Sequence, residues 1–304
     1  PLMHEFELIK NYFQKLSKKS PSALKLNDDV FFDKKKSLVV SVDTYFEGIH
    51  FIDFKKPDLV IKKIIRSSIS DLICKGVKPK YYFISGSGNK NTFSKLNLSK
   101  ISNSLNQEQN KYRIILGGGD TVYSNKLSFT ITSIGFAGDI IYRNKAKIHD
   151  DIYVSGNLGD SYMGLLFLKN KIKLNNLLGK YFTNQYFMPN IQFKLIKQIK
   201  KFANTSIDIS DGLLTDLEKM INVQKLSYKL NLENIPISNN LKKVLNVKKL
   251  SKINYISNGD DYQILFTASK DKRRIIKKIS SNYRIKITQI GSIESLDKKP
   301  SIID

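Results

Sequence analysis

The feature that most constrains this chain is a series of short acidic motifs placed at Gly- and Ser-flanked breaks. The motifs run from Asn27 to Tyr262, on a chain whose overall formal net charge is +24. Carboxylate and hydroxyl oxygens are hard ligands that suit Mg²⁺, and a magnesium site commonly serves a phosphorylated substrate, because the metal neutralises its charge. The series therefore indicates bound cations. Its members are Asn27-Asp28-Asp29, Ser41-Val42-Asp43-Thr44, Ser70-Asp71, Gly117-Gly118-Gly119-Asp120-Thr121, Asp208-Ile209-Ser210-Asp211-Gly212 and Gly259-Asp260-Asp261-Tyr262.

Length and composition predict a globular protein of one large domain or two medium ones. The chain has 304 residues, of which 41% are hydrophobic, enough to form a core. No apolar run approaches the roughly 20 residues of a membrane span, and no signal peptide opens the chain, so we expect no membrane partner. A single cysteine, Cys74, excludes an internal disulfide and a multi-cysteine metal site. These properties fit a reducing cytoplasm.

The positive charge has two interpretations. With 51 Lys and Arg against 27 Asp and Glu, the chain could bind a nucleic acid or an anionic membrane. The lysines are scattered, however, and no basic block is interleaved with aromatic residues. We therefore favour a solvated lysine surface by about three to one and expect no nucleic-acid partner. A gel-shift titration would detect the alternative by its steep dependence on salt.

Hydrophobic periodicity predicts strands and helices in both halves. Residues 4–16 have helical spacing, and 37–43 form a β-branched run typical of a buried strand. Asp58 is a candidate cap for a helix that reaches Cys74 and stops at Gly76. Asp71 would lie in its last turns, where a carboxylate opposes the helix dipole unless a cation compensates. The other expected strands are 81–85, 112–116, 128–138, 152–155, 226–232, 262–267 and 283–290, and the other helices are 93–105, 161–168, 213–221 and 271–279.

The mixture of strands and helices predicts an α/β (α+β) protein with two mixed-sheet domains. The polar segment 139–151 is the expected joint. We therefore expect an N-terminal domain over residues 1–138 and a C-terminal α/β domain over 139–304.

Two motifs stand out beside plainer alternatives. Gly117–Thr121 follows the predicted strand 112–116, and its glycines would let backbone N–H groups approach phosphate oxygens. Alone, this motif has no better than even odds against the alternative, a flexible turn with an exposed Asp120. It fits neither a Walker loop nor the dinucleotide fingerprint. Asp208–Gly212 places two carboxylates around a hydroxyl, and the alternative is ordinary turn chemistry.

Two single residues, His50 and Cys74, each have a functional and a structural interpretation. His50 could contact an anionic or aromatic substrate, although a lone histidine is more often structural, by about two to one. Cys74 lies in an apolar helix and is interpreted as a packing residue rather than a nucleophile.

Taken in order, the motifs resemble the thiamine-monophosphate kinases. That family belongs to an ATP-binding superfamily with aminoimidazole-ribonucleotide synthetase, selenophosphate synthetase and a hydrogenase-maturation protein. The resemblance covers residues 5 to 293, and its most specific pieces are Asp43–Phe51 and Asp208–Gly212. The first of these favours the thiamine kinases over their relatives. Besides the acidic motifs, the matching residues are Glu5-Phe6, Leu8-Ile9, Glu47-Gly48-Ile49-His50-Phe51, Leu72, Gly76, Arg143 and Gly156-Asn157-Leu158-Gly159.

This resemblance implies ATP as co-substrate, several Mg²⁺ ions, and a homodimer in which the N-terminal sheets pair. The N-terminal domain would bind ATP and Mg²⁺ and form the dimer. One departure concerns Asp260, which is one methylene shorter than the expected Glu. The implied metal ligands are Asp29, Ser41, Asp43, Asp71, Asp120, Asp208 and Asp211, the implied ATP contacts are Gly119, Asp120, Arg143 and Ser210, and the implied substrate contacts are His50 and Asp260.

The implied reaction moves the γ-phosphoryl group of ATP onto thiamine monophosphate, giving thiamine diphosphate and ADP. The acceptor is already an ionised phosphate, so we expect direct in-line transfer with no catalytic side chain and no phospho-enzyme. The alternatives are an aminoimidazole-ribonucleotide synthetase-like enzyme with another acceptor, and a homologue that binds ATP without turnover.

Overall fold

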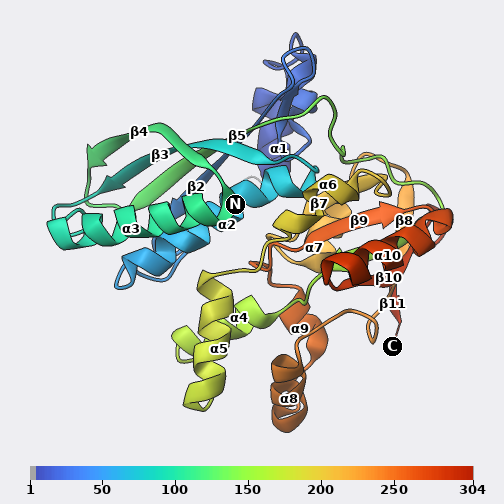
Figure 1. The fold of residues 1–304 in the computed structure, drawn as a ribbon. Helices are drawn as coiled ribbons and strands as arrows, with labels where there is room; N and C mark the ends of the chain where they lie inside the picture. Colours follow the sequence, from blue (N-terminus) through green and yellow to red (C-terminus); the bar gives the residue numbers. More distant parts are fainter. Residues whose placement is uncertain (1–4, 304) are drawn as a thin grey trace.

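The computed structural model describes residues 5–303, which contain two mixed β-sheets (Figure 1). The first sheet has the strand order β1-β2-β5-β3-β4, and the second has the order β11-β8-β10-β6-β9-β7. Pairing is antiparallel except between β3 and β4 and between β8 and β11. The first sheet comprises β1 (Phe31–Asp33), β2 (Leu38–Phe46), β3 (Pro79–Gly88), β4 (Ile115–Tyr123) and β5 (Ser128–Phe136). The second comprises β6 (Asp151–Ser155), β7 (Thr205–Asp208), β8 (Leu226–Asn231), β9 (Ile264–Ala268), β10 (Ile287–Ser295) and β11 (Ser301–Ile303).

Helices cover one face of the first sheet. α2 (Pro57–Cys74) and α3 (Lys95–Tyr112) pack there together. α2 also contacts β7 of the second sheet and α5 (Asn176–Phe187), so it runs between the two halves (Figure 1). Its proline start suits a helix N-terminus, and its apolar side chains from Val60 to Ile73 are fully buried. This central helix carries Asp71 into the interior.

The opposite face of the first sheet is uncovered in this chain. Side chains alternate in β2 and β5, with every second residue buried against the helices. The alternate residues of β2 and β5, together with those of β3 and β4, point away from the helices and remain accessible. We call this the open face and define it by its exposed apolar residues Val42, Phe46, Phe83, Ile115, Val122 and Phe136.

Strands β6, β7 and β9 of the second sheet are buried on both faces. All residues of β6 are buried, with Ile152 and Val154 in one core and Tyr153 in another. α7 (Leu213–Met220) packs into the first of these cores, and α10 (Arg273–Tyr283) and α6 (Ile196–Ile199) into the second. A strand that is buried on both faces is usually a near-continuous apolar run, and β9 has this kind of sequence.

A helical group extends from the second sheet (Figure 1). α4 (Asp160–Leu168) packs on α5 and on α9 (Lys252–Ile256), and Met163, Phe182 and Leu241 join them in one apolar cluster with α8 (Asn239–Lys248). The remaining helical segments are α1 (Glu5–Leu8), the π-helix Ile9–Phe13 and the 3₁₀ segments Pro21–Leu26, Phe193–Leu195 and Lys270–Lys272. Across residues 5–303, no helix has the length and apolar character that crossing a bilayer requires.

The structure confirms the predicted fold class and corrects several local expectations. The first residue of the helix expected over 4–16 lies outside the described residues; within them the helical segments run from Glu5 to Phe13 and leave Tyr12, Phe13 and Leu16 exposed. Asp58 is not the cap of α2, because Lys56 holds that position and Asp58 lies in the first turn. The strand expected to start at Tyr112 starts at Ile115, since α3 continues through Tyr112.

The Gly117–Asp120 segment is the largest correction, because it lies inside β4 and not in a turn after a strand. The glycines serve close packing instead. A Cβ on Gly117 would lie 2.7 Å from the ring of Phe83, and a Cβ on Gly119 would lie 1.8 Å from the carbonyl oxygen of Ile84. Glycine is found inside a strand where another backbone approaches closely, as it does here.

Candidate active site

Three carboxylates from distant segments meet beside α2. Asp43 comes from β2, Asp71 from the last turns of α2, and Asp208 from the end of β7. Their neighbours tie them to the scaffold: Ser70 donates its Oγ hydrogen to Asp208 Oδ2 at 2.7 Å, and the Tyr45 hydroxyl donates to Asp43 Oδ2 at 3.3 Å. Contacts of α2 with β2 and β7 bring the three together.

These three carboxyl groups form no ion pair with a described residue; Asp208 is buried, and Asp43 and Asp71 are half-buried. Burial raises the pKa of Asp71 well above its usual range, and the neighbouring Asp43 and Asp208 raise it further. Burial is also the main cause of the raised pKa values of Asp43 and Asp208, and Asp29 contributes to both. The charged forms are disfavoured because the carboxylates repel one another away from water. A cation among them would reverse that cost.

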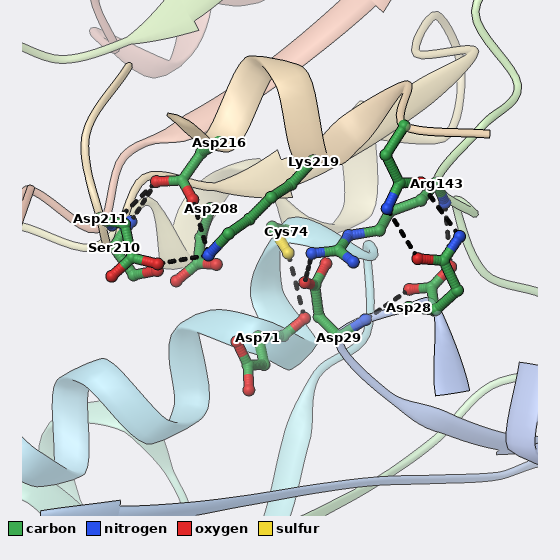
Figure 2. A network of polar contacts seen from close by, with 12 residues as sticks. Asp28, Asp29, Asp71, Cys74, Arg143, Asp208, Ser210, Asp211, Asp216 and Lys219 are labelled. Atoms are coloured by element: carbon green, nitrogen blue, oxygen red, sulfur yellow. Dashed lines mark hydrogen bonds and ion pairs between the residues drawn. The ribbon is translucent and has the colours of Figure 1, made fainter. Parts of the chain in front are cut away.

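Asp28 and Asp29 are instead neutralised by cations of the protein. Lys75, which is fully buried, forms ion pairs with Asp28 at 2.9 Å and Asp29 at 2.6 Å. Arg143 pairs with Asp29 at 3.0 Å, and its backbone N–H donates to Asp28 (Figure 2). Burial alone would raise the pKa of Asp29, but Lys75 and Arg143 outweigh it and lower that pKa. Arg143 thus reaches the acidic motif at Asn27–Asp29 from the segment between the sheets.

The loop 208–212 is held by a carboxylate that the sequence did not single out. Asp216 Oδ2 accepts the backbone N–H groups of Ser210, Asp211 and Gly212 at 2.9, 2.9 and 3.1 Å (Figure 2). Asp211 is more than half exposed and forms an ion pair with Lys219. The loop therefore presents Ser210 and Asp211 beside Asp208 in a fixed backbone conformation.

The remaining predicted ligands divide between the two faces of the first sheet. Ser41 is buried on the α2 face, with its Oγ 3.5 Å from the Ser68 carbonyl oxygen. Asp120 pairs with Ser85 in the β-ladder and lies on the open face. Strands β5 and β3 separate it from β2, a distance of about 14 Å across three strand spacings. The structure therefore does not bring Asp120 or Gly119 to Asp43 within one chain.

The fit of this site to Mg²⁺ rests on its donor atoms. Within residues 5–303, no group of three or more His, Cys, Asp or Glu side chains is arranged to hold a metal ion as it stands. The donors are nevertheless mutually repelling carboxylates, half-buried at Asp43 and Asp71 and buried at Asp208, that form no ion pair with a described residue. Hard oxygen donors in this state are what Mg²⁺ complements.

His50 and Asp260, the expected substrate contacts, interact electrostatically. Burial lowers the pKa of His50, Asp260 opposes that shift, and the buried Lys63 adds to it. The His50 Nδ1 atom accepts the backbone N–H of Phe46 at 2.9 Å, which fixes its ring beside the end of β2. Asp260 borders a cavity of about 620 Å³ that Arg66, Lys111 and Lys286 also line.

Four charged residues near the site were missed by sequence reasoning: Lys63, Lys75, Asp216 and Lys219. The three lysines carry no signal in a chain with 51 Lys and Arg residues. Asp216 follows Asp211 by five positions, in the first turn of α7, where an acidic residue is a known helix-start preference. That signal could have identified Asp216 as a brace for the loop.

The fold and acidic site define a two-sheet α/β protein of the AIR synthase related class. The family model described as AIR synthase related protein, N-terminal domain, matches residues 26–137. The thiamine-monophosphate kinase of Buchnera aphidicola subsp. Acyrthosiphon pisum is 34% identical over 99% of this chain and 94% of its own length. That of Haemophilus influenzae is 30% identical over 96% of this chain and 89% of its own length. The chain belongs to the thiamine-monophosphate kinase family.

Solved structures agree with this assignment. The structure of AaThiL complexed with AMPPCP and TMP has a TM-score of 0.87 at 27% identity, over 100% of this chain and 96% of that one. Thiamine monophosphate kinase from Aquifex aeolicus has a TM-score of 0.84 at 26% identity, over 99% and 98%.

Proposed function

We infer that this chain is a thiamine-monophosphate kinase that transfers the γ-phosphoryl group of ATP to thiamine monophosphate. The observation that carries this is the meeting of the half-buried Asp43 and Asp71 with the buried Asp208, three mutually repelling carboxylates, in a chain of this family. AaThiL, which shares the fold throughout, takes the ATP analogue AMPPCP and TMP. The acceptor is an ionised phosphate, so no side chain needs to remove a proton from it.

Asp43, Asp71 and Asp208 would hold Mg²⁺, with Asp29, Asp211 and Ser41 at the edges of the same region. When bound, the metal would neutralise charge on the two phosphate groups that must approach each other. The chain's own residues perform the positioning: Asp216 fixes the loop of Ser210, and the Lys75 and Arg143 pairs fix Asp29. Arg143 and Ser210 would contact ATP, and His50 and Asp260 the thiamine phosphate.

We also propose a homodimer that forms through the open face. Its six exposed apolar residues come from four adjacent strands, which is the composition expected of a surface that another copy covers. Asp120 lies on this same face and is about three strand spacings from β2. Gly119 and Asp120 would therefore serve the ATP site of the second copy, which reconciles their role with their position.

The two sheets suggest a division of the chain into two domains. We propose that residues 1–138 form the ATP-, Mg²⁺-binding and dimerisation domain and that 139–304 form the C-terminal domain. The two sheets, which lie within 31–136 and 151–303, support this division. A cytoplasmic location is supported by the ATP-dependent reaction and by the buried, free thiol of Cys74.

The test is a phosphorus NMR assay with ATP, Mg²⁺ and thiamine monophosphate, run beside thiamine and an aminoimidazole precursor. We expect thiamine diphosphate to appear in step with ADP, to stop when EDTA is added, and to leave no phospho-protein. Turnover with the aminoimidazole precursor alone would show that the acceptor is wrong. Saturable ATP binding without any product would indicate an inactive homologue.

A further inference from the structure

Lys63 is a buried cation that faces the substrate side of the site. It lies on α2, two turns before Asp71, and its side chain is 2% exposed. Burying a lysine is unfavourable unless its ammonium group is paired and hydrogen-bonded. Its Nζ forms an ion pair with Asp260 Oδ2 at 3.0 Å and donates to the Tyr186 carbonyl oxygen at 3.1 Å. Nζ also lies 3.9 Å from the centre of the Tyr186 ring.

Asp260 is held from two sides. Lys63 contacts its Oδ2, and the Tyr262 hydroxyl donates to its Oδ1 at 2.9 Å. The carboxylate remains about 28% exposed and borders the cavity. Its short side chain therefore has a fixed direction, with lone pairs still available to a ligand.

The backbone around Asp260 needs this support. Gly259, Asp260 and Tyr262 all have positive φ angles, of 73°, 59° and 50°, which L side chains rarely adopt. Hydrogen bonds from the N–H groups of Asp260 and Tyr262 to the carbonyl oxygens of Ser210 and Ile209 dock the loop against the proposed ATP-binding loop. A conformation of this kind persists where its surroundings over-determine it, and Lys63 is one of those constraints.

We propose that Lys63 is a positioning residue for thiamine monophosphate: it orients Asp260 toward the substrate and so sets the affinity for the phosphate acceptor and not for ATP. This inference rests on the proposed function. Lys63 is too deeply buried to contact substrate itself, and its partners belong to the acceptor side, whereas Arg143 and Ser210 lie with the loop assigned to ATP. A residue that only stabilised the fold would affect both substrates alike.

The test is steady-state kinetics on the purified full chain with Lys63→Met, Lys63→Arg, Asp260→Asn and the double variant Lys63→Met/Asp260→Asn. Lys62→Met is the matched control, on the same helix and half-buried. We expect Lys63→Met to raise KM for thiamine monophosphate by about tenfold or more while KM for ATP stays within about twofold. Because Lys63 acts through Asp260, the double variant should match Asp260→Asn alone.

Lys63→Arg tests the role without removing the charge, and thermal unfolding of every variant separates loss of fold from loss of affinity. Equal changes in the two KM values, or additive effects in the double variant, would overturn the inference. So would a Lys63→Met enzyme that behaves like Lys62→Met. Wild-type protein that fails to phosphorylate thiamine monophosphate would overturn the proposed function instead, which keeps the two failures distinct.

Discussion

At the residue scale, the presence or absence of a cationic partner separates the acidic residues of the site. Asp29 has Lys75 and Arg143 within ion-pair distance, so it is charged and stable in the folded protein. Among residues 5–303, Asp43, Asp71 and Asp208 have no such partner and repel one another in a half-buried to buried position. Asp43, Asp71 and Asp208 are therefore candidates to bind an external cation, whereas Asp29 is already paired with cationic side chains of the protein.

Asp43→Asn tests the metal assignment. We expect the rate of phosphoryl transfer to fall by more than the roughly 10–100-fold that follows loss of an outer-sphere partner, because a ligand itself is weakened. The measurement is kcat across a Mg²⁺ titration, with the loop variant Asp53→Asn as control. Near-normal turnover at saturating Mg²⁺ would show that Asp43 is not a ligand.

Asp160 provides a pH-dependent prediction away from the metal site. Burial raises its pKa above 3.8, although the Ser238 and Tyr181 hydroxyls donate to it and partly offset the shift. The folded protein therefore binds this proton more tightly than the unfolded chain, and stability is lost as pH rises from 3.8 through the folded pKa. In Asp160→Asn, we expect the difference in Tm from wild type to become more positive between pH 4 and 7. A difference that does not change with pH would contradict this.

At the element scale, α2 organises the active site. It supplies Asp71 to the proposed metal region and Lys63 to the proposed acceptor region, and it contacts β2, β7 and α5. Its position is set by a buried ion pair with α3, in which Arg66 donates to both oxygens of Glu108, at 2.8 and 3.0 Å. The guanidinium also donates to the Pro189 carbonyl oxygen at 3.3 Å.

Glu108→Ala should therefore destabilise the protein strongly. Removing one partner of a buried pair leaves the other charge uncompensated, and we expect the free energy of unfolding to fall by about 3–5 kcal/mol in denaturant titrations. The control is Asp53→Ala, which breaks the exposed pair with Lys55 and should cost less than about 1 kcal/mol. Comparable losses in the two variants would mean that the buried pair does not anchor α2.

At the scale of the whole molecule, the proposed homodimer would bring Asp120 to the candidate site. Asp120 occupies the open face, while the other acidic residues lie on the α2 side or beyond it. A second copy that covers the open face would remove exposed apolar surface and bring its Asp120 to the site in a single step. Assembly and activity are then linked.

Phe83→Glu should convert the proposed dimer into monomers, because a charge on the open face is costly to bury. The mass in solution, measured by light scattering, reports the change, and Val247→Glu on the exposed end of α8 is the control. Mixing the inactive variants Asp120→Asn and Asp208→Asn should restore about a quarter of wild-type activity if Asp120 acts across the interface. No recovery in mixtures shown to contain hybrid dimers would place Asp120 in its own chain's site.

The sequence by itself determined much of the fold and the composition of the site. The β-branched run before Asp43 and the apolar spacing after Pro57 predicted β2 and α2, because local periodicity reports which residues face a core. Helices α5 and α8 were not predicted from the sequence. The acidic motifs also identified the family correctly.

Only the tertiary structure decided which acidic residues share a surface and which cations neutralise them. Gly117–Gly119 read as a turn because glycine permits both turns and close strand packing, and only the ring of Phe83 shows which one applies. Lys63 and Lys75 could not be separated from the other lysines, because burial selects them and burial arises when α2 is enclosed between the two sheets. Local sequence predicted which types of residue form the site, and tertiary packing determined which of them contact one another.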